Sequence, residues 1–114
     1  MRHRQVRMLP FGVLGIGLLA ICAGPSKAQS AAGTVYKAKC AMCHGPDGKG
    51  ETPAGKSMKA VSFAAPEVAK MSDEELETVI TKGKNKMPAF EGKLKKEQIV
   101  DLVAYIRELA KKSS

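Results

Sequence analysis

The chain has 114 residues, a length that allows at most one domain. It carries 19 lysines and arginines against 11 aspartates and glutamates, a formal net charge of +8, but it has no tryptophan, two tyrosines and three phenylalanines. So few aromatic rings argue against a surface that stacks nucleic-acid bases, despite the positive charge.

Residues 1–28 have the composition of a secretory signal peptide. Arginines stand near the start, a largely apolar stretch over residues 9–23 follows, and small residues occupy the third and first positions before a cut after Ala28. The apolar stretch is broken by a proline and several glycines, and it is shorter than the roughly 20 residues that a membrane span needs. We therefore expect cleavage after Ala28 and a periplasmic or otherwise extracytoplasmic domain of residues 29–114, which meets a membrane only through its partners.

Two alternatives to this cleavage remain open. The apolar stretch could stay uncleaved as an amino-terminal membrane anchor. The chain could also be a lipoprotein cut before Cys22, although Ile21 is bulky where a small residue is expected. If the leader is removed, Cys22 and His3 leave with it, and residues 29–114 keep two cysteines and one histidine.

The first predicted helix covers residues 31–43, with Val35 and Tyr36 near its apolar side. The turn Gly45-Pro46-Asp47-Gly48 ends it, because proline presets the first corner of a turn while aspartate and glycine suit the following positions. Residues 45–63 are rich in glycine and lysine and have no sustained period of 3.6 or 2. We expect an ordered loop there, with room for one helical turn.

Two further helices have clear signals. Ser72 and Glu75 form the pattern of a capping box, and Gly83 is placed to end that helix. Residues 83–94 are expected to be a loop, and residues 96–111 show the spacing of an amphipathic helix. Its apolar residues are Ile99, Leu102, Val103, Ile106, Leu109 and Ala110. Because no alternating strand pattern is present, the sequence predicts an all-α domain of three or four helices.

The segment Cys40-Ala41-Met42-Cys43-His44 has the C-x-x-C-H pattern of a covalent attachment site for a c-type haem. Two thiols of such a site bond to the haem, and the adjacent histidine binds the iron. Structural zinc needs four ligands, whereas residues 29–114 offer three cysteine or histidine ligands. A redox thiol pair is expected near a βαβ pattern, which the sequence lacks. A buried haem would also stabilise a small domain that has few large apolar side chains.

The second axial ligand of the iron has to come from another residue type, and methionine is the usual partner. Met42 lies inside the attachment motif, and Met71 directly precedes a helix cap, where apolar residues pack on the core. Met58 and Met87 both lie in predicted loops. Met87 is preferred because Pro88 after it keeps its backbone extended and its loop has glycines on both sides. Met58 remains the alternative.

Two other patterns are discounted. Residues 50–57 fit the phosphate-loop pattern G-x-x-x-x-G-K-S, but that loop works only between a strand and a helix of a parallel sheet. We therefore expect no nucleotide binding. The acidic run over residues 73–77 stands in the first turn of a predicted helix, where acids complement the helix dipole. We interpret it as a solvated face and not as a catalytic carboxylate pair.

The positive charge of residues 29–114 is concentrated in one stretch, residues 82–96, which has a single acidic residue, Glu91. Its basic residues are Lys82, Lys84, Lys86, Lys93, Lys95 and Lys96. One interpretation is a solvated lysine-rich loop. The other is a docking surface near an exposed haem edge, where positive charge would steer an acidic redox partner.

Several of these features together resemble the class I c-type cytochromes, in particular their small, single-haem bacterial type. The resemblance rests on Tyr36, the Cys-Ala-Met-Cys-His-Gly run over residues 40–45, the Lys-Met-Pro-Ala-Phe run over residues 86–90, and the closing helix. It covers nearly all of residues 29–114. It implies the class I cytochrome c fold, with three to four helices wrapped around one covalently bound haem c.

The resemblance also implies roles for individual residues. Cys40 and Cys43 would form the thioether bonds to the haem, while His44 and Met87 would be the proximal and distal ligands of its iron. In this family the first and last helices cross closely, so Ala32 or Gly33 would approach Tyr105 or its neighbours. A proline carbonyl usually accepts the ring N–H of the haem histidine, and Pro53 would be that proline here.

The function that follows from the resemblance is one-electron transfer between redox proteins, without catalysis. An iron with both axial positions filled has no open site for a substrate. Two alternatives stay open: a haem enzyme or small-ligand sensor with an open or labile distal site, and a small subunit that relays electrons within a larger oxidoreductase.

We expect the purified, exported protein to begin at Gln29, because the small residues before it suit the export peptidase. Intact-mass spectrometry checks this expectation. A mass that includes residues before Gln29 contradicts the cleavage, and a lipid adduct on Cys22 indicates the lipoprotein alternative.

Overall fold

The computed structural model describes residues 12, 15, 17, 24 and 26–114. Most of the predicted signal peptide, with His3 and Cys22, lies outside the described residues. Within them, no helix is long and apolar enough to cross a membrane.

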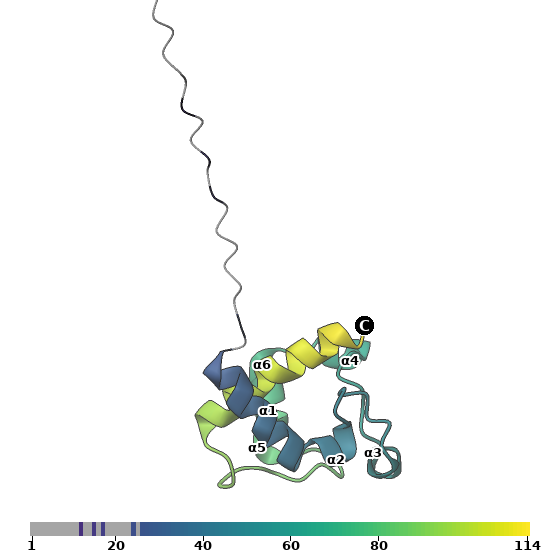
Figure 1. Cartoon of the computed structure of the whole chain (residues 1–114). Coiled ribbons are helices and arrows are strands. Elements are labelled where there is room, and N and C mark those ends of the chain that lie inside the picture. The colour runs from purple at the N-terminus through teal and green to yellow at the C-terminus, as the bar shows by residue number, and fades with distance from the viewer. Residues whose placement is uncertain (1–11, 13–14, 16, 18–23, 25) are drawn as a thin grey trace, which may run out of the picture.

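The described chain forms six helices that surround a common centre (Figure 1). Their bounds are α1 Lys27–Lys39, α2 Ala41–His44, α3 Pro53–Met58, α4 Pro66–Ala69, α5 Asp73–Lys82 and α6 Lys96–Lys112. The long α6 packs on both α1 and α5, while the short α2 packs on α1 and α3. Residues 26–114 contain no named strand, and only two isolated bridges occur in the loops. The predicted all-α class is therefore confirmed.

The bounds predicted for the first helix were wrong at both ends. The helix begins at Lys27 because the Ser26 side chain accepts a hydrogen bond from the N–H of Gln29 (3.3 Å). It stops at Lys39, and the N–H groups of Cys43 and His44 both return to the carbonyl of Cys40, which starts the separate turn α2. The predicted cut after Ala28 would remove this cap and shorten α1.

Both helices with clear sequence signals are confirmed. The Ser72 side chain accepts from the N–H of Glu75 (3.1 Å), and the Glu75 carboxylate accepts from the N–H of Ser72 (2.7 Å), so the capping box of α5 is complete. Gly83 follows the last residue of α5. The last helix ends one residue beyond its predicted end.

Two short helices have a proline at or near their first position, where its missing N–H costs no hydrogen bond. One of them, α3, is a short helix within residues 45–63, where the sequence allowed one helical turn in an ordered loop. The other, α4, was not predicted, although Pro66 was its signal.

The core lies between α1, α5 and α6. Tyr36 and Leu102 are its largest fully buried side chains. All the residues predicted for the apolar face of α6 are buried except Ala110, which is partly buried. Gly33 is the close-contact residue of α1, since a Cβ there would lie 3.3 Å from Cε2 of Tyr105. The expected crossing of the first and last helices is thus confirmed, with Gly33 at the contact.

Arg107 fastens α6 to the segment between α4 and α5. Its guanidinium donates to the carboxylate of Asp73 (3.0 Å and 3.1 Å) and to the carbonyls of Met71 (2.5 Å) and Val68 (3.4 Å). Such a planar fork satisfies several acceptors at once. Asp73 is therefore paired with Arg107 while it remains exposed to solvent, as the interpretation of the acidic run as a solvated face expects.

Tyr36 connects the helix crossing to the turn after α2. Its ring is fully buried, and its hydroxyl donates to the carbonyl of Gly45 at 2.6 Å. Burial raises the pKa of the Tyr36 hydroxyl well above its ordinary value, so the group stays a neutral donor.

We expect Tyr36→Phe to lower the free energy of unfolding by about 1 kcal/mol, because a buried hydrogen bond is lost while the ring still fills its site. Chemical denaturation measures the change. Tyr105→Phe is the matched control, since Tyr105 is only partly buried and the structure gives its hydroxyl no hydrogen bond. Equal effects of the two substitutions would contradict the role of the Tyr36–Gly45 bond.

Candidate functional site

The two cysteines of the C-x-x-C-H motif stand at the start and inside α2. Both are free thiols and both are partly buried. Burial raises the pKa of the Cys40 thiol to about 11, against a smaller lowering effect of the nearby Lys39. A thiol–disulfide exchange site needs a thiolate at neutral pH. Cys40 is therefore protonated at neutral pH, which does not suit that chemistry.

His44 ends α2 with its ring partly buried. The ring stacks on Phe63, with the centroids 4.7 Å apart. Burial lowers the pKa of His44, so the ring is neutral at neutral pH and keeps a lone pair for a metal. Its Nδ1 is buried without a hydrogen-bond partner, which is costly for a polar atom unless a bound group accounts for it. These properties fit a haem ligand.

The expected hydrogen bond between the His44 ring and the carbonyl of Pro53 is absent from the structure, and this prediction was wrong. Pro53 is the first residue of α3, so its carbonyl points along the helix axis instead. A different residue ties α3 to the attachment motif. The Thr52 hydroxyl donates to the carbonyls of Met42 (2.6 Å) and Cys43 (3.1 Å) and accepts from the N–H of Gly55 (2.9 Å).

The glycines of the phosphate-loop pattern have a packing role. A Cβ at Gly55 would collide with the carbonyl oxygen of Cys43, and a Cβ at Gly50 would lie 2.6 Å from the carbonyl oxygen of Ala60. Both glycines are therefore required by close backbone approach beside α2. No strand precedes them in the described part of the chain.

The four methionines of residues 29–114 differ in their surroundings. Met42 and Met58 are exposed, with 77% and 47% of their surface accessible. Met71 and Met87 are partly buried and pack on the hydrophobic core. Phe63, on which His44 stacks, belongs to the same core cluster. Met71 and Met87 thus both pack on the core, whereas Met58 is exposed.

The loop that carries Met87 is attached to the end of α5. Lys84 and Met87 exchange two backbone hydrogen bonds (2.9 Å and 3.2 Å) across a turn with Asn85 at φ 54°. The N–H groups that follow, those of Phe90 and Glu91, donate to carbonyls in the last turn of α5. The loop is therefore ordered by its backbone on a rigid helix.

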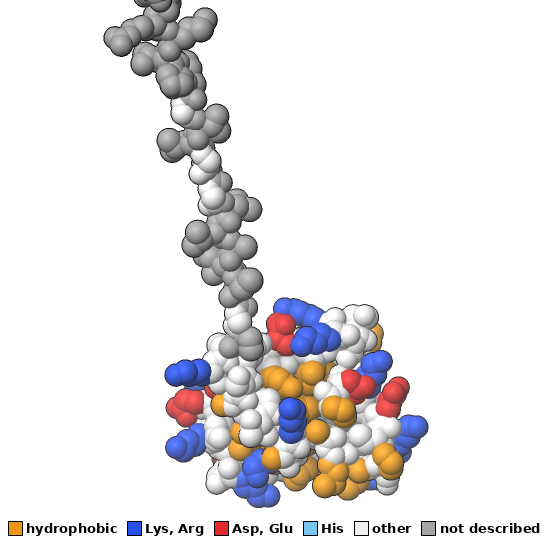
Figure 2. Space-filling model, in the orientation of Figure 1, with side chains coloured by type: hydrophobic (Ala, Val, Ile, Leu, Met, Phe, Trp, Pro, Cys, Tyr) orange, Lys and Arg blue, Asp and Glu red, His pale blue; other side chains and the backbone are white. Residues whose placement is uncertain are grey.

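The six lysines of residues 82–96 are all exposed. One of them, Lys86, donates from Nζ to the carbonyl of Ser57 in α3 (3.2 Å), so it bridges the methionine loop and α3. Figure 2 shows basic and acidic side chains around the rim of one face, with hydrophobic surface across its middle and along its lower edge, where Figure 1 places α2 and α3. Exposed apolar residues of that region are Met42, Met58 and Val61.

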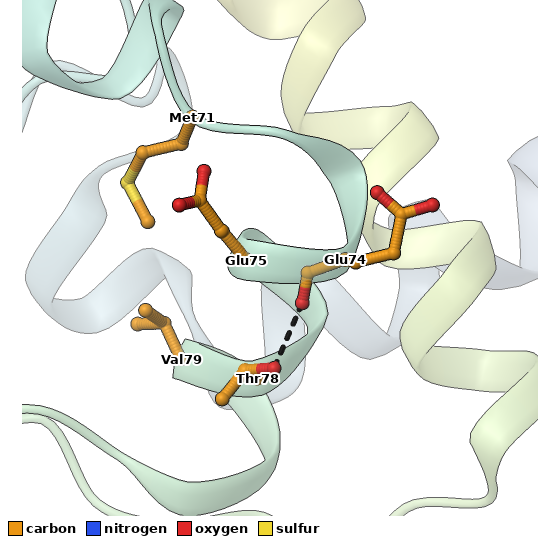
Figure 3. A pocket seen from close by; sticks show the side chains of 5 residues that line it. All are labelled: Met71, Glu74, Glu75, Thr78 and Val79. Carbon is orange, nitrogen blue, oxygen red and sulfur yellow. Dashed lines mark hydrogen bonds between the residues drawn. The ribbon is translucent and has the colours of Figure 1, made fainter.

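A hollow of about 350 Å³ lies on α5, away from the motif and the methionine loop (Figure 3). It is lined by Met71, Glu74, Glu75, Thr78 and Val79. The Glu75 carboxylate already caps the helix, and the Thr78 hydroxyl donates to the carbonyl of Glu74. No group of three metal-binding side chains occurs there or elsewhere in the described ranges.

Comparison with known proteins adds independent information. The model of the family described as cytochrome c oxidase, cbb3-type, subunit III matches residues 27–106. The chain is 40% identical over 72 residues to a cytochrome c6 of Nostoc sp. (strain PCC 7120), covering 63% of this chain but only 62% of that protein. It is 35% identical over 83 residues to the cytochrome c6 of Leptolyngbya boryana, covering 73% of this chain and 94% of that protein.

Solved structures agree with these matches. One described as a c-type cytochrome superposes with a TM-score of 0.63 at 35% identity, covering 68% of this chain and 95% of its own. A chain of the Kuenenia stuttgartiensis reducing HAO-like protein complex superposes with a TM-score of 0.64 at 24% identity, covering 88% of this chain and 50% of its own. The second likeness concerns the fold alone.

Proposed function

This chain belongs to the c-type cytochrome family described as cytochrome c oxidase, cbb3-type, subunit III, and we propose on that premise that it is a one-electron carrier like cytochrome c6. The observation that carries the proposal is the C-x-x-C-H motif on α2, with two free thiols beside a neutral, partly buried His44.

The residues of α2 fit one haem c. Cys40 and Cys43 would hold it through thioether bonds, and His44 would bind its iron from one side. The bound haem would supply an iron that alternates between the ferrous and ferric states. The protein's own part is to fix the ligands and to exclude water, through Phe63 against the His44 ring and through Thr52, which fastens α2 to α3.

Met87 is the proposed distal ligand. Its partial burial, its packing on the core and the backbone bonds of its loop support this choice over the exposed Met58. A thioether ligand raises the reduction potential of a c-type haem and fills the second axial position. An iron with two protein ligands favours electron transfer over ligand binding, and nothing in the geometry favours an enzyme or sensor. The family description, which names an oxidase subunit, keeps a relay subunit as the second candidate.

The partner of the proposed carrier is a redox protein with an acidic surface, met outside the cytoplasm after removal of residues 1–28. The exposed lysines of residues 82–96 support this, because they surround the loop of the proposed ligand and would steer an acidic protein toward it. The exposed apolar side chains on α2 and α3 provide a surface that a partner can desolvate.

We expect Met87→Ala to abolish the weak iron–sulfur absorption band of the oxidised protein, because the substitution removes the proposed sulfur ligand. The reduced variant should also bind carbon monoxide at least tenfold faster than the unchanged protein. Met58→Ala removes the same group from an exposed position and should leave both properties unchanged. A band that survives in Met87→Ala and disappears in Met58→Ala would reverse the assignment.

We expect the oxidation of the reduced protein by ferricyanide, a small anion, to slow as salt is added, on the order of tenfold between 10 mM and 300 mM ionic strength. The reason is that exposed positive charge near the haem attracts the anion only while it is unscreened. Stopped-flow absorbance measures the rate. Lys84→Gln should weaken the salt dependence more than Lys70→Gln, which removes an equal charge from an exposed site outside residues 82–96. Rates that do not change with salt would contradict the docking surface.

A further inference from the structure

Gly83 lies directly against the backbone of the methionine loop. It has a left-handed backbone with φ 74° and follows the last residue of α5. A Cβ built on it would lie 2.6 Å from the carbonyl oxygen of Met87, 3.0 Å from the carbonyl carbon of Pro88 and 2.9 Å from the nitrogen of Ala89. All three atoms belong to the backbone, so no side-chain rotation could make room.

The loop has little freedom to move away from this contact. Its first residue, Lys84, exchanges hydrogen bonds with Met87, and Phe90 beyond it donates to the carbonyl of Ile80 (3.1 Å). On its other side, Lys86 reaches across to the carbonyl of Ser57 in α3. Beneath it, α5 is fixed in the core by the buried Leu76 and Ile80. Any side chain at position 83 would therefore push the Met87 backbone outward and strain these bonds.

We propose that Gly83 is a positioning residue for the Met87 sulfur: its missing side chain lets the loop backbone rest on the end of α5 at the depth that the iron requires. This inference rests on the proposed function, in which Met87 is the distal ligand. Metal–ligand distances are held to within about 0.2 Å. Relieving a contact of 2.6 Å to ordinary packing distance requires a larger displacement than that, on the order of half an ångström or more.

The chain offers a matched control in Gly92. Its φ of 76° is nearly that of Gly83, but no atom lies within 4 Å of a Cβ built on it. Gly83→Ala and Gly92→Ala therefore both place an L-residue at a positive φ. Only Gly83→Ala adds a collision with the ligand loop, so the comparison separates backbone strain from displacement of the sulfur.

The experiment uses the holoprotein of each variant. We expect Gly83→Ala to weaken or abolish the iron–sulfur band, to lower the reduction potential and to speed carbon monoxide binding to the reduced protein at least tenfold. Gly92→Ala should match the unchanged protein in all three measurements. A general loss of stability would move neither the band nor the potential of the folded fraction, so these measurements report on the sulfur itself.

Gly83→Asn gives a second, independent variant. Asparagine carries the same Cβ as alanine at this position, where φ 74° and ψ 170° strain any L-residue. We expect Gly83→Asn to have the same altered band, potential and carbon monoxide binding as Gly83→Ala. If Gly83→Ala yields no holoprotein, the comparison is made with Gly83→Asn. A normal band and potential in Gly83→Asn would overturn the proposal, as would equal properties of Gly83→Ala and Gly92→Ala. Neither result would affect the assignment of Met87, which fails only if Met87→Ala keeps the band.

Discussion

The contact on which the rest of the structure depends is the burial of Tyr36 at the crossing of α1 and α6. Its ring lies 5.2 Å from that of Tyr105 and 6.2 Å from that of Phe63, measured between centroids. Its hydroxyl holds the carbonyl of Gly45, just after the attachment motif. Phe63 in turn stacks on His44. Tyr36 and Phe63 therefore connect the crossing of α1 and α6 to the ring of His44, the candidate iron ligand.

Glycine allows a close backbone contact at two places. Gly55 lets α3 approach the carbonyl of Cys43 in the attachment turn. Gly83 lets the Met87 loop rest on the end of α5. Because glycine has no side chain, it allows two backbone segments to approach more closely than any other residue does. In a domain with few large apolar side chains, such backbone contacts hold loops that have few side-chain contacts.

The proposed distal ligand and the concentrated positive charge lie in one segment of this protein. Residues 82–96 contain Met87 and six lysines but only one acidic residue, Glu91. Lys86 connects this segment to α3. In the proposed carrier, a partner drawn to these lysines would meet the loop that sets the iron's environment. The exposed charge would act during the encounter with a partner, because it attracts an opposite charge over a distance. Added salt weakens this attraction. The backbone hydrogen bonds of the loop would hold the proposed ligand in place.

The sequence by itself determined the features that depend on neighbours in the chain. The C-x-x-C-H spacing indicated the cofactor, the Ser72–Glu75 capping box and Gly83 gave the bounds of α5, and the spacing of apolar residues gave α6. These signals are local, since a helix cap or an amphipathic face involves residues at most a few turns apart. The family resemblance added the crossing of the first and last helices, although it did not distinguish Ala32 from Gly33.

Only the tertiary structure decided which groups meet across long loops. It broke the first helix at Cys40, left the His44 ring without the carbonyl of Pro53, and paired Asp73 with Arg107. It packed Met87 partly into the core and left Met58 exposed, although both methionines lie in loops predicted from the sequence. It also revealed that Gly83 both ends a helix and touches the ligand loop. Such contacts depend on the relative placement of packed elements, and short-range patterns carry no information about that placement.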